Sequence, residues 1–135
     1  MSESGLILVI GATGNVGGGL VPALLEKGAN VRALVRNEEA ARRLSESGVE
    51  PVIGDLTDPA SLDHAFEGVS KVFLLTAGTE DQVELARNAI DAARRSGNPH
   101  VVRQSAFVPE PASETILGRQ HAEIEAELRS SGLPY

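Results

Sequence analysis

Short apolar runs alternate with longer amphipathic segments along the chain. The apolar runs are too short for helices and nearly uniform in character, which is typical of strands buried on both faces. They predict strands at Leu6–Ile10, Asn30–Val35, Val49–Ile53, Lys71–Leu75 and His100–Gln104. The segments between and after them have helical spacing and predict helices at Val16–Lys27, Glu38–Glu46, Pro59–Phe66, Glu80–Ser96 and Ser113–Ser130.

Glycine and proline positions agree with these boundaries. A glycine follows each of the first four helices, where a left-handed residue commonly ends a helix, at Gly28, Gly48, Gly68 and Gly97. Asp58-Pro59 has the form of a helix cap followed by a first-turn proline. Pro22 falls inside the first helix, so we expect a local irregularity there. The alternation predicts an α/β, doubly wound parallel sheet with strand order 3-2-1-4-5.

A glycine-rich turn follows the first strand and reads Gly11-Ala12-Thr13-Gly14-Asn15-Val16-Gly17. Gly11 lets the chain turn sharply, Gly14 lets the backbone approach a pyrophosphate, and Gly17 lets the helix pack close to the sheet. Free N–H groups at the helix start would then face the phosphates. The strand–turn–helix context predicts a dinucleotide-binding Rossmann domain, and the alternative is a turn with a structural role alone.

The end of the second strand bears on the choice of dinucleotide. NAD enzymes usually carry an acidic residue here that binds the ribose 2′-hydroxyl. This chain has Arg36 instead, and a guanidinium suits a 2′-phosphate. Arg32 has the same parity along the strand and could share its face. We therefore expect NADP, with NAD as the alternative; Arg36 could also be a solvated charge.

Two further strand ends should meet the same crevice. Asp55 follows the third strand, where its carboxylate could accept a hydrogen bond from the adenine amine or could form a turn with Thr57. Thr76 and Ala77 follow the fourth strand, where small residues leave room beside the nicotinamide and its ribose.

Composition narrows the remaining function classes. Hydrophobic residues make up 41% and aromatic residues 3%, which suits the aliphatic core of a parallel sheet. A net charge of −7 disfavours nucleic acid as a partner. Without cysteines, and without histidines at metal-ligand spacing, we expect no metal site. No apolar run approaches the roughly 20 residues of a membrane span, so we expect a cytoplasmic protein with no membrane partner.

As a set, these motifs resemble the NmrA-like branch of the atypical short-chain dehydrogenase/reductase family. The matching segments are those at 11–17, 31–36, 54–56, 72–76 and 89–93. The resemblance implies NAD(P)(H) binding, with members that reduce quinones or other small carbonyl or olefinic compounds, and other members that look like cofactor sensors. Carried over by position, it implies a pyrophosphate cradle formed by Gly11, Thr13, Gly14, Asn15, Val16 and Gly17. It further implies adenosine-phosphate, adenine and nicotinamide-side contacts by Arg36, by Asp55 and Leu56, and by Thr76 and Ala77.

The resemblance weakens at the catalytic residues. The wider superfamily uses a Tyr-x-x-x-Lys pair, and alignment places Leu117 at the tyrosine position and His121 at the lysine position. Leu117 cannot donate a proton, whereas imidazole titrates near neutrality. His121 is therefore the remaining candidate, with an ordinary helix histidine as the alternative. Ser105 matches the serine region of strand five, although Ala106 is an alternative alignment.

Family members continue beyond this point with a sixth strand and a C-terminal substrate lobe. We therefore expect residues 1–135 to form one NAD(P)-binding Rossmann domain that is truncated relative to the family and lacks both. Strand five would then be an exposed edge, which predicts a homo-oligomer formed through that edge. Three functions stay open: an oxidoreductase that transfers hydride to a quinone-like or other small organic acceptor, a non-catalytic NADP(H)-sensing regulatory or scaffold protein, and an inactive nucleotide-binding fragment.

Overall fold

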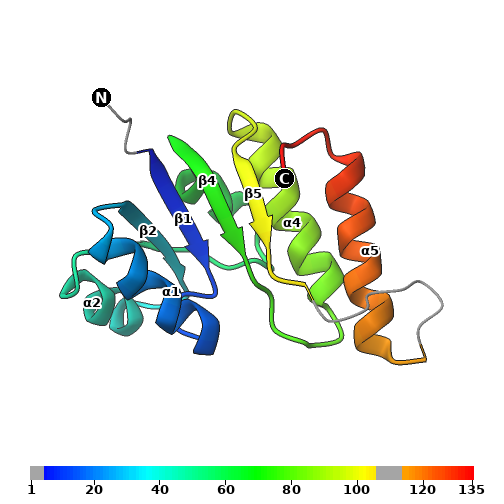
Figure 1. Cartoon of the computed structure of the whole chain (residues 1–135), viewed down its shortest axis with the longest axis horizontal. Helices are drawn as coiled ribbons and strands as arrows, with labels where there is room; N and C mark the ends of the chain where they lie inside the picture. Colours follow the sequence, from blue (N-terminus) through cyan, green and yellow to red (C-terminus); the bar gives the residue numbers. More distant parts are fainter. Residues whose placement is uncertain (1–4, 106–113) are drawn as a thin grey trace.

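A twisted sheet of parallel strands forms the centre of the computed structural model, which describes residues 5–105 and 114–135 (Figure 1). Its five strands are β1 (Leu6–Ile10), β2 (Asn30–Val35), β3 (Glu50–Ile53), β4 (Val69–Leu74) and β5 (His100–Arg103). They pair in the order β3-β2-β1-β4-β5, every pair parallel. The predicted fold class and strand order are confirmed.

The helices occupy both faces of this sheet. They are α1 (Asn15–Glu26), α2 (Glu38–Ser45), the 3-10 turn η1 (Pro59–Ser61), α3 (Leu62–Phe66), α4 (Gln82–Arg95) and α5 (Ile116–Ser130). The four glycines predicted to end helices all have positive φ. The predicted start of the last helix at Ser113 lies outside the described residues. Thr115 caps α5, because its Oγ1 accepts a hydrogen bond from the N–H of Gly118 at 3.0 Å.

Alternation along each strand divides the apolar residues between two cores. The larger core lies on the face covered by α3, α4 and α5 and includes Leu8 and Leu74 of the central strands with Phe66 of α3. The smaller core lies on the face covered by α1 and α2 and includes Val9 and Val31. The central strand β1 contributes to both cores, as expected for a strand buried on its two faces.

Several local expectations were wrong. The segment 59–66 is a 3-10 turn followed by one short helix. Asp58 stands at the cap position with Pro59 in the first turn, as predicted, but its side chain makes no capping bond; Ser61 Oγ instead donates to the Asp58 carbonyl at 2.7 Å. Helix α1 runs unbroken through Pro22, which lies on its exposed side. The outer strands are not buried on both faces, since Ile53 and Val102 are 45% and 52% exposed.

Arg32 has a structural role and does not accompany Arg36. Its side chain is 11% exposed and pairs with Glu50 of the neighbouring strand at 3.2 Å. Its Nη1 also donates to the carbonyl oxygens of Ala65 and Glu67 at 2.9 and 2.7 Å. Arg32 therefore joins β2 and β3 to the end of α3, on the side of the sheet opposite to α1.

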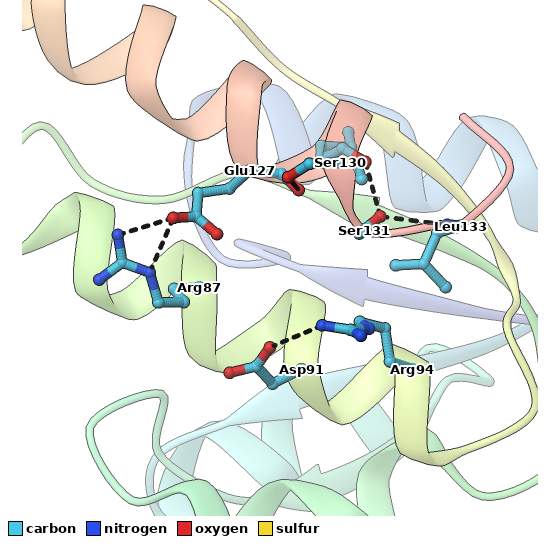
Figure 2. Close-up of polar contacts among 8 residues, drawn as sticks. Arg87, Asp91, Arg94, Glu127, Ser130, Ser131 and Leu133 are labelled. Carbon is cyan, nitrogen blue, oxygen red and sulfur yellow. Dashed lines mark hydrogen bonds and ion pairs between the residues drawn. The ribbon is translucent and has the colours of Figure 1, made fainter.

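Helices α4 and α5 lie side by side, and charged residues bridge them (Figure 2). Arg87 Nε and Nη2 donate to Glu127 Oε1 at 3.2 and 2.9 Å. After α5 the chain turns back, and the N–H of Leu133 donates to Ser131 Oγ at 3.1 Å. It then meets the free edge of the sheet, where the N–H of Val101 donates to the Pro134 carbonyl at 2.8 Å. Across residues 5–105 and 114–135, no helix combines the length and apolar character needed to cross a membrane.

Candidate functional site

A cavity of about 910 Å³ opens at the carboxyl ends of β1, β2, β3 and β4. This volume lies in the upper part of the range typical of small-molecule sites. All of the predicted dinucleotide-binding residues except Gly17 line it: Gly11, Thr13, Gly14, Asn15, Val16, Arg36, Asp55, Leu56, Thr76 and Ala77. Residues from four separate loops therefore meet where ligands bind in doubly wound folds.

The turn between β1 and α1 is built on close backbone contacts. Gly11 has φ +93°, which favours glycine, and its carbonyl accepts from the N–H of Gly14 at 3.1 Å. A Cβ on Gly17 would lie 2.0 Å from that same carbonyl oxygen, so only glycine fits there. Gly17 acts by letting the helix approach the turn and does not line the cavity.

The start of α1 presents backbone donors to the cavity. The first helical bond runs from the N–H of Gly18 to the Gly14 carbonyl at 2.7 Å, so the N–H groups of Asn15, Val16 and Gly17 precede it. Among the described residues no side chain caps this end, and its first turn holds no acidic residue. Uncapped donors at a helix N-terminus favour a bound anion such as a phosphate.

A cationic group and a carboxylate face each other at the ends of β2 and β3. Arg36 is exposed at the rim of the cavity. Asp55 Oδ1 accepts from the N–H and the hydroxyl of Thr57, each at 2.8 Å, which confirms the turn interpretation. These bonds, and then the charge of Arg36, lower the pKa of Asp55, although slight desolvation opposes them. Asp55 is therefore an anionic acceptor at neutral pH, and its place in the turn does not remove it from the cavity wall.

The loop after β3 is held from two sides. Ser61 Oγ accepts from the N–H of Asp55 at 2.9 Å, while its own hydrogen goes to the Asp58 carbonyl at 2.7 Å. From α4, Asn88 Nδ2 donates to the Leu56 carbonyl at 2.7 Å. These contacts fix the backbone beside Leu56, which is half-buried in the cavity wall.

His121 and Ser105 are not among the residues that line the cavity. His121 is buried between α5 and β5, and its Nδ1 lies 2.6 Å from Arg103 Nη2. Because a guanidinium only donates, Nδ1 accepts and the neutral ring carries its proton on Nε2. Burial, and then the charge of Arg103, lowers the pKa of His121, with Glu125 opposing. Ser105 Oγ is buried and has no hydrogen-bond partner within the described part of the chain, and Ala106 lies outside that part.

Leu117 lies beside the loop that follows β4. It is 45% exposed, and a Cβ on Gly78 would lie 3.5 Å from its Cδ1. The position predicted to correspond to a catalytic tyrosine is therefore near the loop after β4, but it carries no ionisable group. Tyr135 lines a separate groove of about 270 Å³ with Val102 and Arg103 of β5.

Sequence reasoning missed several cavity residues. Among the described residues, the cavity is also lined by residues that the sequence analysis did not single out, including Asn37, Ala40, Thr79, Asp81 and Leu85. The signal was present at Asn37, which follows Arg36 and caps α2 by accepting from the N–H of Ala40 at 2.8 Å. Ala40 lies on the first turn of α2, Thr79 and Asp81 lie in the loop after β4, and Leu85 lies on the first turn of α4. In the described ranges no three histidine, aspartate or glutamate side chains gather in a way that could hold a metal ion.

Comparison with known proteins gives a consistent result. The sequence pattern of the NmrA-like family matches residues 3–135. The NAD(P)H azoreductase of Xenophilus azovorans is 36% identical over 130 residues, which are 96% of this chain and 46% of the azoreductase. The chain spans about half the length of the curated relatives it matches.

Two solved structures have the same fold over nearly the whole chain. The triphenylmethane reductase of Citrobacter sp., complexed with NADP(H), has a TM-score of 0.85 and 36% identity, covering 96% of this chain and 47% of the reductase. An NADPH-dependent quinone oxidoreductase from Escherichia coli, complexed with NADPH, has a TM-score of 0.86 and 29% identity, covering 94% of this chain and 46% of the oxidoreductase.

Two neighbouring glycines of α1 test the geometry of the turn. A Cβ on Gly18 would meet no atom within 4 Å, so Gly18→Ala should raise the free energy of unfolding by roughly 0.5–1 kcal/mol through helix propensity. Gly17→Ala should lower it by roughly 1–3 kcal/mol, because the methyl group meets the Gly11 carbonyl. Urea denaturation measures both. Equal effects would contradict the close-contact account of Gly17.

The Arg103–His121 contact predicts a pH dependence of stability. The pKa of His121 in the folded protein lies below its usual value of 6.5, so the unfolded chain binds more protons in the interval between the two. Above pH 6.5 the His121 ring is neutral in both states and the free energy of unfolding has its full value. It decreases as the pH falls from 6.5 toward the pKa of His121 in the folded protein. In this interval the free energy of unfolding should fall by at most about 1.4 kcal/mol per pH unit.

His121→Asn is the matched variant, because its amide oxygen can still accept from Arg103 but does not titrate. Its unfolding free energy, measured by urea denaturation, should lack this portion of the slope. Parallel wild-type and variant curves would show that His121 is not the titrating group.

Proposed function

The chain belongs to the NmrA-like family, and on that premise we propose that it binds a nicotinamide dinucleotide for hydride transfer to a quinone-like or other small organic acceptor. The observation that carries this proposal is the uncapped start of α1 at the floor of the cavity. Two linked phosphates fit the free N–H groups of Asn15 and Val16, which line the cavity, and Gly14 leaves no side chain in their way. The solved relatives that bind NADP(H) and NADPH support the same ligand class.

We propose NADP(H) as the preferred form. Arg36 is exposed at the rim of the cavity beside the end of β2, where a 2′-phosphate would sit. A guanidinium can bind a phosphate through two parallel hydrogen bonds. Arg32 cannot assist, because its side chain is bound to Glu50 and to two backbone carbonyls.

Two observations support the proposed class of acceptor: Leu117 supplies no proton donor, and some relatives are named for the reduction of azo compounds and quinones. A bound NADPH supplies a hydride, and Thr76 and Ala77 would border its nicotinamide half. Leu117 brings no proton donor to this side, which favours acceptors such as quinones, whose reduced forms are stable anions. Relatives named for the reduction of azo compounds and quinones support this class. The lack of a proton donor at Leu117 also supports the alternative, a cofactor sensor without turnover.

We also propose that the chain self-associates through the edge of β5. Val102 is 52% exposed, and because the N–H of Val101 is already bonded to the Pro134 carbonyl, association would use the remaining length of this edge. Sedimentation velocity should show concentration-dependent association that Val102→Lys abolishes, because a charge on an exposed edge opposes strand pairing. A wild-type chain that stays monomeric at every concentration would contradict this.

Calorimetric titration combined with turnover tests the proposed function. The wild-type chain should bind NADPH, and Gly14→Val should lose binding while remaining folded. NADPH oxidation, followed by absorbance across a panel of quinones, then separates the alternatives. Oxidation above background supports the reductase, and binding without oxidation favours the sensor. Full affinity in Gly14→Val would refute the phosphate assignment.

Arg36→Asp tests the choice of cofactor. Removing a charged contact to the 2′-phosphate should weaken NADPH binding by roughly 1–3 kcal/mol, while NADH binding should be unchanged or improved. Parallel titrations with both dinucleotides measure the ratio. Arg43→Asp is a suitable control, since Arg43 is exposed on α2 and pairs with Glu39. An unchanged NADPH-to-NADH ratio in Arg36→Asp would identify Arg36 as a bystander.

A further inference from the structure

Two glutamines connect α5 to the cavity through a continuous set of hydrogen bonds, here called the amide relay. Thr76 Oγ1 lies 3.1 Å from Gln82 Oε1, and Gln82 Nε2 lies 2.7 Å from Gln120 Oε1. Gln120 Nε2 then donates to the carbonyl oxygens of Thr79 and Glu80 at 3.1 and 3.3 Å. Gln82 is completely buried and its bond to Thr76 is shielded from water, whereas the bonds from Gln120 to the two carbonyls lie at the surface.

The direction of every bond in the amide relay is fixed by its far end. A carbonyl oxygen can only accept, so Gln120 must turn its NH₂ group toward Thr79 and Glu80 and its oxygen toward Gln82. Gln82 must then offer its own NH₂ group to Gln120, which leaves its oxygen facing Thr76. The hydroxyl of Thr76 therefore gives its single proton to Gln82.

This direction determines what Thr76 can offer to a ligand. Thr76 is buried but is one of the residues that line the cavity, and the only hydrogen of its hydroxyl is already committed to Gln82. What remains on the oxygen is acceptor capacity. A ligand group facing Thr76 must therefore be a donor, and a second acceptor there would be repelled.

We propose that Gln82 and Gln120 are positioning residues that hold Thr76 as a hydrogen-bond acceptor for a donor on the ribosyl-nicotinamide half of the dinucleotide. Ribose hydroxyls and the carboxamide NH₂ are the donors of that half. The inference rests on the proposed function and adds to it a role for residues that do not border the cavity. It also makes α5 a support of the cofactor site, because Gln120 lies on that helix.

The same contacts hold the loop that forms this wall. Gln120 bonds the backbone at residues 79 and 80, while Gln82 and Thr76 tie the start of the loop to α4. Figure 1 shows the loop after β4 and the beginning of α5 at the same end of the molecule. Loss of Gln120 should therefore affect the nicotinamide end of the cavity and spare the adenosine end.

Binding of two ligands to matched variants tests this. The ligands are NADPH and adenosine 2′,5′-bisphosphate, which lacks the ribosyl-nicotinamide half. Gln120→Leu cuts the amide relay completely, and Gln120→Glu keeps an acceptor for Gln82 but cannot donate to the two carbonyls. Thr76→Val removes the proposed acceptor itself. Each should weaken NADPH binding by roughly three- to tenfold, with bisphosphate binding within about twofold of wild type.

A double variant and a control separate positioning from general damage. Thr76→Val combined with Gln120→Leu should weaken NADPH binding by less than the product of the single effects, because both act on one contact. Gln104→Leu is the control: its amide bonds only the Ser105 carbonyl among the described contacts, and it should change neither affinity. Thermal unfolding of each variant verifies that it is folded. The 3-acetylpyridine analogue of NADP has no carboxamide N–H; if Thr76→Val weakens it as much as NADP, the donor is a ribose hydroxyl.

Folded Gln120→Glu and Thr76→Val proteins with an unchanged ratio of NADPH to bisphosphate affinity would overturn the inference and leave dinucleotide binding intact. Equal losses for both ligands would also overturn it, because the amide relay would then serve the whole cavity. A wild-type chain that binds neither ligand would refute the proposed function, and this inference with it.

Discussion

The close approach of α1 to the turn before it is the contact on which the site depends. Gly17 lies so near the Gly11 carbonyl that a methyl group would overlap it. This approach starts the helix at Asn15 and leaves its first N–H groups without helical partners at the floor of the cavity. A larger residue at 17 would push the helix away and change where those donors point. The uncapped helix start that borders the cavity is thus a result of packing between backbone segments.

Side chains outside the loops hold the other cavity walls in place through hydrogen bonds to the loop backbone and side chains. Ser61 and Asn88 fix the backbone after β3, and Gln82 with Gln120 fixes the loop after β4. Arg32 secures β2 and β3 to α3 from the opposite side of the sheet. Cavity-lining residues such as Asp55 and Thr76 can remain small because their positions are set by these neighbours.

Strand order, the glycine-rich turn and the four strand ends that border the cavity could be predicted from the sequence, because each depends on local signals, whereas about half of the lining residues were not singled out. Strands buried on both faces read as apolar runs, and parallel strands bring their carboxyl ends to one edge. The roles of Arg32, Gln82 and Gln120 could not be predicted, since their partners lie far along the chain. His121 shows the same limit: an alignment position identified it as a candidate, but burial against Arg103 depends on how α5 packs on β5.

Helix α4 contacts both loops that border the ligand, through Gln82 at its first turn and Asn88 further along. The two residues are about 9 Å apart along the helix axis, given a rise of 1.5 Å per residue. A helix is stiff over this length, so α4 acts as a spacer between the loop after β3 and the loop after β4. Sliding of α4 would move both loops together and preserve their separation, so the width of the cavity between them would stay constant.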